Sequence, residues 1–326
     1  MTQIPTNTAA GLAALQTAAG LYSLDASAWI EVTGADRLRW LNGMLTNGIQ
    51  QLAAGEGNYN FILSAQGRIQ GDAYAFAQSD SVLLQTGASQ LATLMQLLDR
   101  FIIMDDVELH DRTAAYTGIG IAGPQAEAVL GRAAFDLVGL EPIHLRTATW
   151  NGTNVNLIAA YSPLIPRYEL WAAPEHANAL RAALLSTGAV ECNAECVEAL
   201  RILEGTPLFG TDIRERDLPQ ETAQTRALHF TKGCYIGQEI VERIRSRGNV
   251  HRTFSGFLLS GNPPAPGTTL EADGKPVGEL TSCVDLQTEI VALGYIRREA
   301  IDKNLALTFA GGTATPVTLP FAPVRR

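Results

Sequence analysis

Apolar and polar residues follow two alternating patterns along this chain, one typical of strands and the other of amphipathic helices. Apolar runs at Trp29 to Val32 and at Gly118 to Ala122 predict two strands. A glycine follows each run, and then an apolar face with helical spacing. In the first case this face is Leu38, Leu41 and Leu45, in a helix expected to end near Gly48. Both strand-helix units continue with strand-like runs (59–63 and 82–85; 155–159 and 167–172) and a second helix (89–98; 174–186). This repeated order predicts a pseudo-duplicated α+β body.

The pattern changes after residue 250 to short strands separated by turns. Strand-like runs occur at 254–260, 275–282, 290–296 and 305–309, and the segments between them are rich in glycine, proline or polar residues. Such spacing predicts a small antiparallel β-barrel. We therefore expect a first α+β half at residues 1–115, a second α+β half at 116–250, and a C-terminal β-barrel at 251–326.

Composition narrows the protein class without revealing a function. The 326 residues are 46% hydrophobic and 17% charged, with a formal net charge of -9. This acidity disfavours direct, stable binding of nucleic acid, which depends on basic residues, so any link to RNA is expected to be indirect. Arg37 is the first basic residue and no apolar run reaches the length of a membrane span, so we expect no presequence and no membrane insertion. A cytoplasmic location is predicted.

The four cysteines do not form a Cys-x-x-Cys pair, which fits a reducing compartment. Cys192 and Cys196 could in principle ligate a metal. If Asn193 caps a helix, however, Cys196 falls on the apolar face of that helix with Leu200. A role in the core is therefore predicted for this pair, and no metal site is expected.

Cys234 occupies a different setting, because glycines flank it and a helix is predicted directly after it. Ile236, Ile240 and Ile244 recur every four residues, so the helix is expected to start near Ile236 and to stop at Gly248. The positive end of this helix and the nearby Lys232 would favour the thiolate form of the cysteine. The alternative is a buried, structural cysteine that caps a core helix.

A basic stretch interrupts the otherwise acidic chain after this helix begins. Residues 243–254 include four arginines and one histidine but no acid. Such a stretch could receive an anionic ligand, for example a folate carboxylate tail, or it could be a solvated helix face.

The segment Lys-Gly-Cys-Tyr-Ile-Gly-Gln-Glu at 232–239 resembles the signature of the YgfZ-type folate-binding proteins. These are relatives of the glycine-cleavage T-protein that are linked to iron-sulfur cluster assembly and repair and to tRNA modification. The resemblance implies tetrahydrofolate as the ligand, iron-sulfur proteins or their assembly factors as partners, and Cys234 as the reactive residue. It also implies that the other residues of the segment contact folate, namely Lys232, Gly233, Tyr235, Gly237, Gln238 and Glu239.

Three further elements resemble this family. Trp40 to Asn47 is similar to an element whose threonine and asparagine, here Thr46 and Asn47, adjoin the ligand channel; the alternative is a helix C-cap.

Gly67 to Asp72 resembles a turn with paired acids, but Gly71 replaces the first acid. Asp72 is thereby implied to bind folate or to assist proton transfer, the alternative being an aspartate in a surface turn. Glu169, in a strand at 167–170, matches a glutamate that binds the pterin, the alternative being an outward-facing strand residue.

The function implied by these elements is tetrahydrofolate binding in support of iron-sulfur cluster assembly or repair, with an indirect effect on tRNA modification. Two alternatives stay open. One is a tetrahydrofolate-dependent aminomethyltransferase of the glycine-cleavage type, an enzyme that transfers a one-carbon group, for which the missing partner of Asp72 is the main objection. The other is a docking chaperone for cluster proteins that works without folate.

Overall fold

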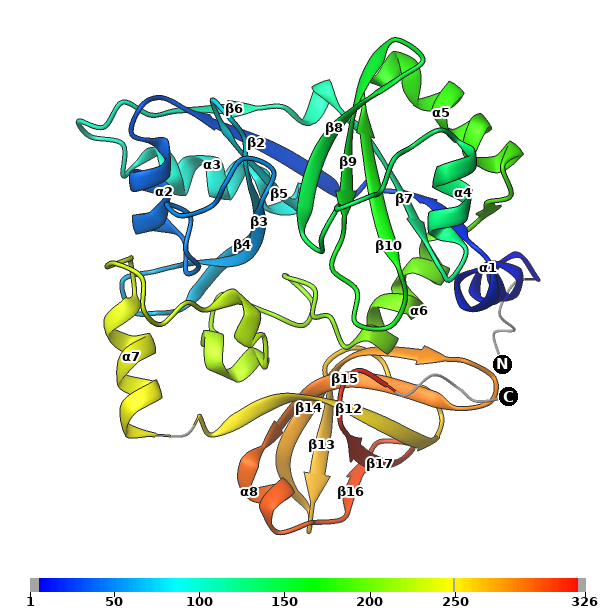
Figure 1. Cartoon of the computed structure of the whole chain (residues 1–326). Coiled ribbons are helices and arrows are strands. Elements are labelled where there is room, and N and C mark those ends of the chain that lie inside the picture. Colours follow the sequence, from blue (N-terminus) through cyan, green and yellow to red (C-terminus); the bar gives the residue numbers. More distant parts are fainter. Residues whose placement is uncertain (1–5, 249, 322–326) are drawn as a thin grey trace. The chain divides into compact units, whose positions relative to one another are not determined.

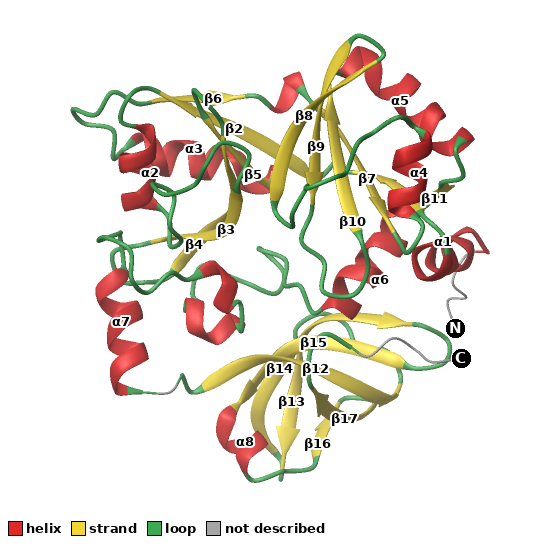
Figure 2. Ribbon diagram, in the orientation of Figure 1, coloured by secondary structure: helices red, strands yellow, loops and turns green. Residues whose placement is uncertain are grey.

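The computed structural model describes residues 6–248 and 250–321 of the chain, and these fall into two compact units. The first unit combines the described part of Met1–Asn60 with Asp72–Glu198, and the second combines Phe61–Gly71 with the described part of Ala199–Arg326. Figure 1 traces the chain through both units, and Figure 2 separates its helices from its strands. None of the described helices is long and apolar enough to cross a bilayer.

The α+β body repeats one order of elements. The first half runs β2 (Ser27–Thr33), α2 (Arg37–Met44), β3 (Gly57–Leu63), β4 (Ile69–Ala77), β5 (Val82–Gly87), α3 (Leu91–Asp99) and β6 (Glu108–Asp111). The second runs β7 (Thr117–Ala122), α4 (Ala126–Arg132), β8 (His144–Trp150), β9 (Thr153–Ala159), β10 (Arg167–Ala172), α5 (Pro174–Ser186) and β11 (Val190–Glu191). Helix α1 (Thr6–Thr17) and strand β1 (Gly20–Ser23) precede both halves.

The strand orders of the two sheets show the same duplication. One sheet has the order β3-β4-β5-β2-β6, and the other has β8-β9-β10-β7-β1-β11. The second sheet therefore repeats the order of the first, with β1 inserted next to its last strand. The predicted pseudo-duplicated α+β body is confirmed, and β5 and β10 are equivalent strands of the two halves.

Strand β10 shows why the first unit has two apolar layers. Successive side chains of a strand point to opposite faces, so Tyr168 and Leu170 lie in a core with residues of α4 and α5. Trp171 points the other way, into a second cluster with Trp29 and Phe76 of the other sheet. The two sheets of this unit therefore pack against each other through aromatic side chains, and Glu169 lies on this inner face of β10.

The second unit contains a closed barrel with the strand order β12-β15-β14-β13-β16-β17. Its elements are β12 (Arg252–Gly261), β13 (Thr268–Ala272), β14 (Lys275–Asp285), β15 (Ile290–Arg297), α8 (Arg298–Asp302), β16 (Leu307–Phe309) and β17 (Gly312–Val317). The predicted antiparallel barrel is confirmed. The sequence pattern missed β13 and β17, because these short strands bury few residues, Leu270 and Ala272 in β13 and Ala314 in β17.

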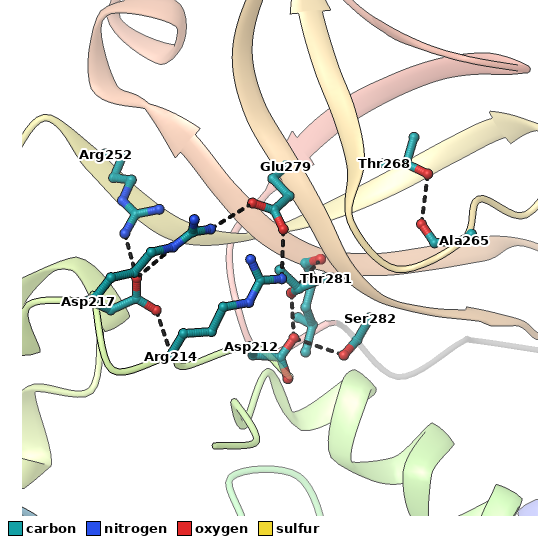
Figure 3. A network of polar contacts seen from close by, with 11 residues as sticks. Asp212, Arg214, Asp217, Arg252, Ala265, Thr268, Glu279, Thr281 and Ser282 are labelled. Carbon is teal, nitrogen blue, oxygen red and sulfur yellow. Dashed lines mark hydrogen bonds and ion pairs between the residues drawn. The ribbon is translucent and has the colours of Figure 1, made fainter. Parts of the chain in front are cut away.

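Hydrogen bonds and ion pairs of buried carboxylates hold the segment at 205–222 to the barrel within the second unit (Figure 3). The fully buried carboxylate of Asp212 accepts hydrogen bonds from Arg201 at 2.7 Å, from Ser282 at 2.8 Å and from Thr281. Arg252 of β12 lies within 3.0 Å of Glu221 and also pairs with Asp217. A buried charge is tolerated only when it is paired, so these contacts determine the path of the chain before the cysteine segment.

Two predicted helix boundaries are wrong. Helix α2 ends at Met44 rather than near Gly48, because the side chain of Asn42 accepts hydrogen bonds from the backbone of Ile49 and Gln50. Such bonds from side chain to backbone compete with the helical pattern. Helix α7 (Gln238–Arg247) begins two residues after Ile236, for a reason that becomes clear at the cysteine segment.

Candidate functional site

Glu169 is a buried carboxylate on the inner face of β10, with 7% of its surface exposed. Its Oε2 accepts hydrogen bonds from Gln85 Nε2 at 2.7 Å and from Trp171 Nε1 at 3.0 Å. No donor within the described part of the chain contacts its Oε1. The alternative of an outward-facing residue is wrong, and one carboxylate oxygen keeps its acceptor capacity.

A glycine lies beside this carboxylate in the sheet, where a tyrosine ring takes up the space next to its backbone. Gly120 of β7 pairs with Glu169 on one side and with Tyr22 of β1 on the other. A Cβ atom at position 120 would lie 2.1 Å from the ring of Tyr22, so the ring occupies the space that a side chain would need. The guanidinium of Arg167 lies 5.6 Å from the centroid of the same ring. The surroundings of Glu169 are therefore aromatic and tightly packed.

Asp72 is a second carboxylate whose orientation is determined by its neighbours. Tyr59 donates its hydroxyl to Oδ2 at 2.6 Å, and Gln90 donates its amide to Oδ1 at 2.8 Å. The Oε1 of Gln90 in turn accepts the backbone N–H of Asp72 at 3.0 Å. Asp72 lies half-buried within strand β4, so the alternative of a surface-turn aspartate is wrong.

Aromatic rings extend between the strands that carry these two carboxylates. The centroids of Tyr59 and Tyr74 are 4.9 Å apart, those of Tyr74 and Phe76 are 6.5 Å apart, and those of Phe76 and Trp171 are 5.6 Å apart. Tyr59 contacts Asp72 and Trp171 contacts Glu169, so the row begins and ends at a carboxylate. Flat aromatic surfaces with a few polar groups are typical of sites for planar ligands.

The element at 40–47 is partly connected to these groups. Asn47 donates from Nδ2 to the carbonyl of Tyr59 at 3.2 Å, which links it to the strand that orients Asp72. Thr46 is fully buried. Trp40 donates its indole N–H to the carbonyl of Phe101 at 3.1 Å, so this contact anchors it to a loop. Contact of these three residues with folate stays a prediction.

The cysteine segment lies in the second unit and starts its helix later than predicted. Gly237 precedes α7 with a φ of 81°, a left-handed conformation that glycine adopts without strain. A Cβ atom at this position would lie 2.6 Å from the carbonyl oxygen of Ser64. The close packing of Gly237 against the turn between β3 and β4 places the helix start at Gln238. Cys234 therefore lies in a non-helical stretch, and its side chain is exposed. The alternative of a buried structural cysteine is wrong.

The two neighbours of Cys234 that carry polar groups are buried. The ammonium of Lys232 lies 5.0 Å from the centroid of the Tyr235 ring, and only 9% of Lys232 is exposed. Burial lowers the pKa of Lys232 to about 7 and raises the pKa of Tyr235 to about 12. Lys232 is therefore only partly protonated at neutral pH, which weakens the support that its charge was expected to give to the thiolate of Cys234.

The remaining residues of the segment are mostly accessible. Gly233 and Glu239 are exposed, and Gln238 accepts the backbone N–H of Tyr235 at 3.3 Å through Oε1. The segment thus combines an exposed thiol with a buried amine and a buried phenol. These groups could react with, or dock, a partner that approaches from solvent.

Cys192 and Cys196 are buried in the first unit, as predicted for a core role. Asn193 accepts the backbone N–H of Cys196 at 3.0 Å, and burial raises the pKa of Cys192 to about 12. Across the described residues, no group of three or more His, Cys, Asp or Glu side chains is arranged to hold a metal ion.

Sequence reasoning missed Tyr59, Gln85 and Gln90, which orient the two carboxylates. Gln85 directly follows the apolar run Val82 to Leu84 of β5, and a polar residue in a largely buried strand is a usable signal. Gln90 carries no such signal, because it follows a loop-like Gly-Ala-Ser stretch.

Comparison with known families accounts for nearly the whole chain. Residues 3–232 match the family described as the GCVT N-terminal domain, and residues 243–323 match the CAF17 C-terminal β-barrel domain. A putative chloroplastic transferase of Arabidopsis thaliana is 26% identical over 83% of this chain, which spans 63% of that protein. Aminomethyltransferases of Streptomyces coelicolor and Geobacillus kaustophilus are 28% and 27% identical over 87% and 94% of the chain, and the matches cover 79% and 88% of those proteins.

Among solved structures, the aminomethyltransferase T of the glycine cleavage system from Bartonella henselae has the same fold. It superimposes with a TM-score of 0.88 over 98% of this chain and 90% of that one, at 19% sequence identity. The α+β body followed by a closed barrel is therefore a T-protein-like fold.

Proposed function

Because the chain belongs to the GCVT-like family with a CAF17-type C-terminal β-barrel, we propose that it binds a reduced folate and supports iron-sulfur cluster assembly or repair. The observation that carries the folate part is Glu169, a buried carboxylate with one oxygen that no described donor contacts. A pterin presents a ring N–H beside an amino group, and the lone pairs of the uncontacted oxygen, Oε1, can accept such donors.

The residues of the first unit fit such a ligand. Glu169 would hold the pterin through its carboxylate, and the ring of the half-buried Tyr74 offers a flat surface. Asp72, held by Tyr59 and Gln90, would accept or return a proton at the folate nitrogens. Bound tetrahydrofolate would supply nitrogen atoms that accept a one-carbon unit. Each of these side chains is oriented by its own hydrogen bonds, so little reorganisation would accompany binding.

Support for the iron-sulfur part comes from Cys234 and its surroundings. An exposed thiol is available to a partner protein or to a cluster in transit, and thiolates are ligands of such clusters. The indirect effect on tRNA modification follows if the modifying enzymes contain clusters. The protein itself need not bind RNA.

Calorimetric titration with tetrahydrofolate tests the folate part. We expect Glu169→Ala to weaken binding by about ten- to a hundredfold, because a charge-assisted contact at a buried site is lost. Glu175→Ala is the matched control, since Glu175 is an exposed carboxylate in the first turn of α5 of the same unit. Equal affinities of the two variants would contradict the role of Glu169.

Cluster-dependent enzyme activity in cells lacking the protein tests the iron-sulfur part. We expect Cys234→Ala to fail to restore this activity and Cys283→Ala, which removes a half-buried barrel cysteine, to restore it. Both variants should fold, which circular dichroism can check. Full restoration by Cys234→Ala would contradict the proposed role of the thiol while leaving the folate part intact.

Aminomethyl transfer is a second candidate function, favoured by the oriented carboxylate of Asp72 and by the aminomethyltransferases among the relatives. Gly71 stands where the resemblance places the partner acid, so we expect no efficient turnover. The measurement is formation of methylene-tetrahydrofolate from an aminomethylated lipoyl carrier. Rapid turnover that Asp72→Asn abolishes would favour the enzyme over the assembly factor.

A further inference from the structure

A pocket of about 710 Å³ lies within the second unit, between the turn that joins β3 to β4, the 3-10 turn at Pro219–Thr222 and helix α7. Its size is within the range of small-molecule sites, roughly 300 to 1,000 Å³. The apolar side chains of its wall are Ala65, Leu218, Ile240, Ile244 and Val250. The polar ones are Gln66, Arg68, Glu221, Arg243 and His251.

The charges around this pocket leave two cations without an acidic partner. The neighbouring network balances itself, since Arg214, Arg216 and Arg252 pair with Asp217, Glu221 and Glu279. Glu221, the acid in the wall, is therefore compensated by Arg252. The guanidinium of Arg68 donates to the carbonyl of Arg216 but pairs with no carboxylate of the described chain. No described residue forms a hydrogen bond or an ion pair with the guanidinium of Arg243.

The arginines of the basic stretch that begins at Arg243 thus have separate roles. Arg252 belongs to the buried network, and Arg245 lies 3.5 Å from Glu242 and 4.5 Å from the ring of Phe230. Arg247 has a side chain outside the described part of the structure. Among the arginines whose side chains are described, Arg243 is the member of the stretch that faces the pocket with its charge uncompensated.

We propose that this pocket binds a small organic anion. Its carboxylate or phosphate group would pair with Arg68 and Arg243, since guanidinium groups bind both oxyanions through paired hydrogen bonds. Its apolar part would lie against Leu218, Ile240 and Ile244. The ligand class follows from the combination of two cations without acidic partners and an apolar wall. The site is composed of second-unit residues alone and does not depend on folate binding at Glu169.

Fluorescent dyes test this proposal on the full-length protein. The probe is 1-anilinonaphthalene-8-sulfonate, and its neutral counterpart is N-phenyl-1-naphthylamine, which has the same rings without the sulfonate. We expect the anionic dye to bind, and Arg68→Gln and Arg243→Gln each to weaken it by about three- to tenfold. Arg245→Gln is the matched control on the same helix and should leave affinity unchanged. Glu169→Ala should also leave it unchanged.

Competition identifies the anionic group. Displacement of the dye by phenyl phosphate but not by phenylacetate would indicate a phosphate ligand, and the reverse would indicate a carboxylate. The proposal is overturned if neither compound displaces the dye, if the neutral dye binds as well, or if Arg245→Gln weakens binding as much as Arg243→Gln. Loss of dye binding in Glu169→Ala would overturn it too, because the dye would then occupy a site in the first unit. Tetrahydrofolate binding itself is tested separately, by the calorimetric titration.

Discussion

The carboxylates of the first unit and the cysteine segment of the second unit differ in how far their functional groups are exposed to solvent. Glu169 is buried, and hydrogen bonds from the side chains of Gln85 and Gln90 orient Glu169 and Asp72 respectively. Cys234 is exposed on a non-helical stretch, while the neighbouring Lys232 and Tyr235 are buried. The first arrangement favours rigid recognition of a ligand that becomes enclosed. The second favours reaction with a partner that arrives from solvent.

This difference predicts that the two sets of residues will respond differently to substitution. A buried carboxylate acts through geometry, so its orientation depends on neighbours such as Gln85, which donates a hydrogen bond to it, and Gly120, which pairs with it in the sheet. An exposed thiol acts through its accessibility to solvent and its reactivity. Its neighbours matter because they determine the conformation of the segment that exposes it. Substitutions that change either the orientation of Glu169 or the accessibility of Cys234 therefore test this difference directly.

The largest contrast is expected in cysteine reactivity. Cys192 and Cys196 are buried, Cys283 is half-buried and Cys234 is exposed. Burial raises the pKa of Cys192 to about 12 and that of Cys283 to about 11, which suppresses their thiolate forms. We expect iodoacetamide to modify Cys234 at least about a hundredfold faster than Cys192 at neutral pH. Mass spectrometry of peptides taken over time measures this, and similar rates at the two cysteines would contradict the assigned exposure.

The shape of the cysteine segment is expected to depend on Gly237. An alanine there would adopt an unfavourable φ and would also collide with the carbonyl oxygen of Ser64. We expect Gly237→Ala to lower the free energy of unfolding by about 2 to 3 kcal/mol.

Gly210→Ala is the control for this substitution, because Gly210 has a φ of 89° but nothing within 4 Å of its would-be Cβ. It should cost only about 1 kcal/mol from the backbone conformation alone. Urea titrations of both variants provide the comparison. Equal losses would show that the contact with Ser64 contributes nothing.

The burial of Lys232 predicts a pH dependence of stability. Its pKa is lowered from 10.5 to about 7 in the folded protein, so between these values the unfolded chain binds more protons. Stability contributed by this group therefore rises as the pH increases from about 7 towards 10.5, by at most about 1.4 kcal/mol per pH unit. Lys232→Met should remove this slope, and urea titrations across this range would detect it. Parallel pH profiles of the wild type and the variant would refute the lowered pKa.

The smallest effect is expected from removing one orienting neighbour of Glu169. Gln85→Leu deletes the donor at 2.7 Å but leaves Trp171, so tetrahydrofolate affinity should fall by about fivefold, equivalent to roughly 1 kcal/mol. Gln78→Leu, which changes a glutamine bonded to Ser81 in the loop before β5, is the control. An unchanged affinity in Gln85→Leu would mean that the hydrogen bond does not orient the carboxylate for binding.

Several features could be predicted from the sequence because they are local. Period-two and helical patterns depend on neighbouring residues, so strands such as β7 and β10 and the helix α5 were located correctly. The duplicated body followed by a barrel was predicted in the same way. The core role of Cys196 followed from Asn193, which lies only three residues away.

Only the tertiary structure decided which polar groups are buried and what holds them. The contact between Gln85 and Glu169 joins residues 84 positions apart, and the Tyr59 hydroxyl that orients Asp72 comes from a neighbouring strand. The start of α7 depends on the approach of Ser64 to Gly237, which lies far along the chain. The proton affinity of Lys232 likewise follows from its burial. Packing between residues far apart in the sequence sets the hydrogen-bond partners and the local polarity. The order of polar and apolar residues along the chain therefore predicts these properties poorly.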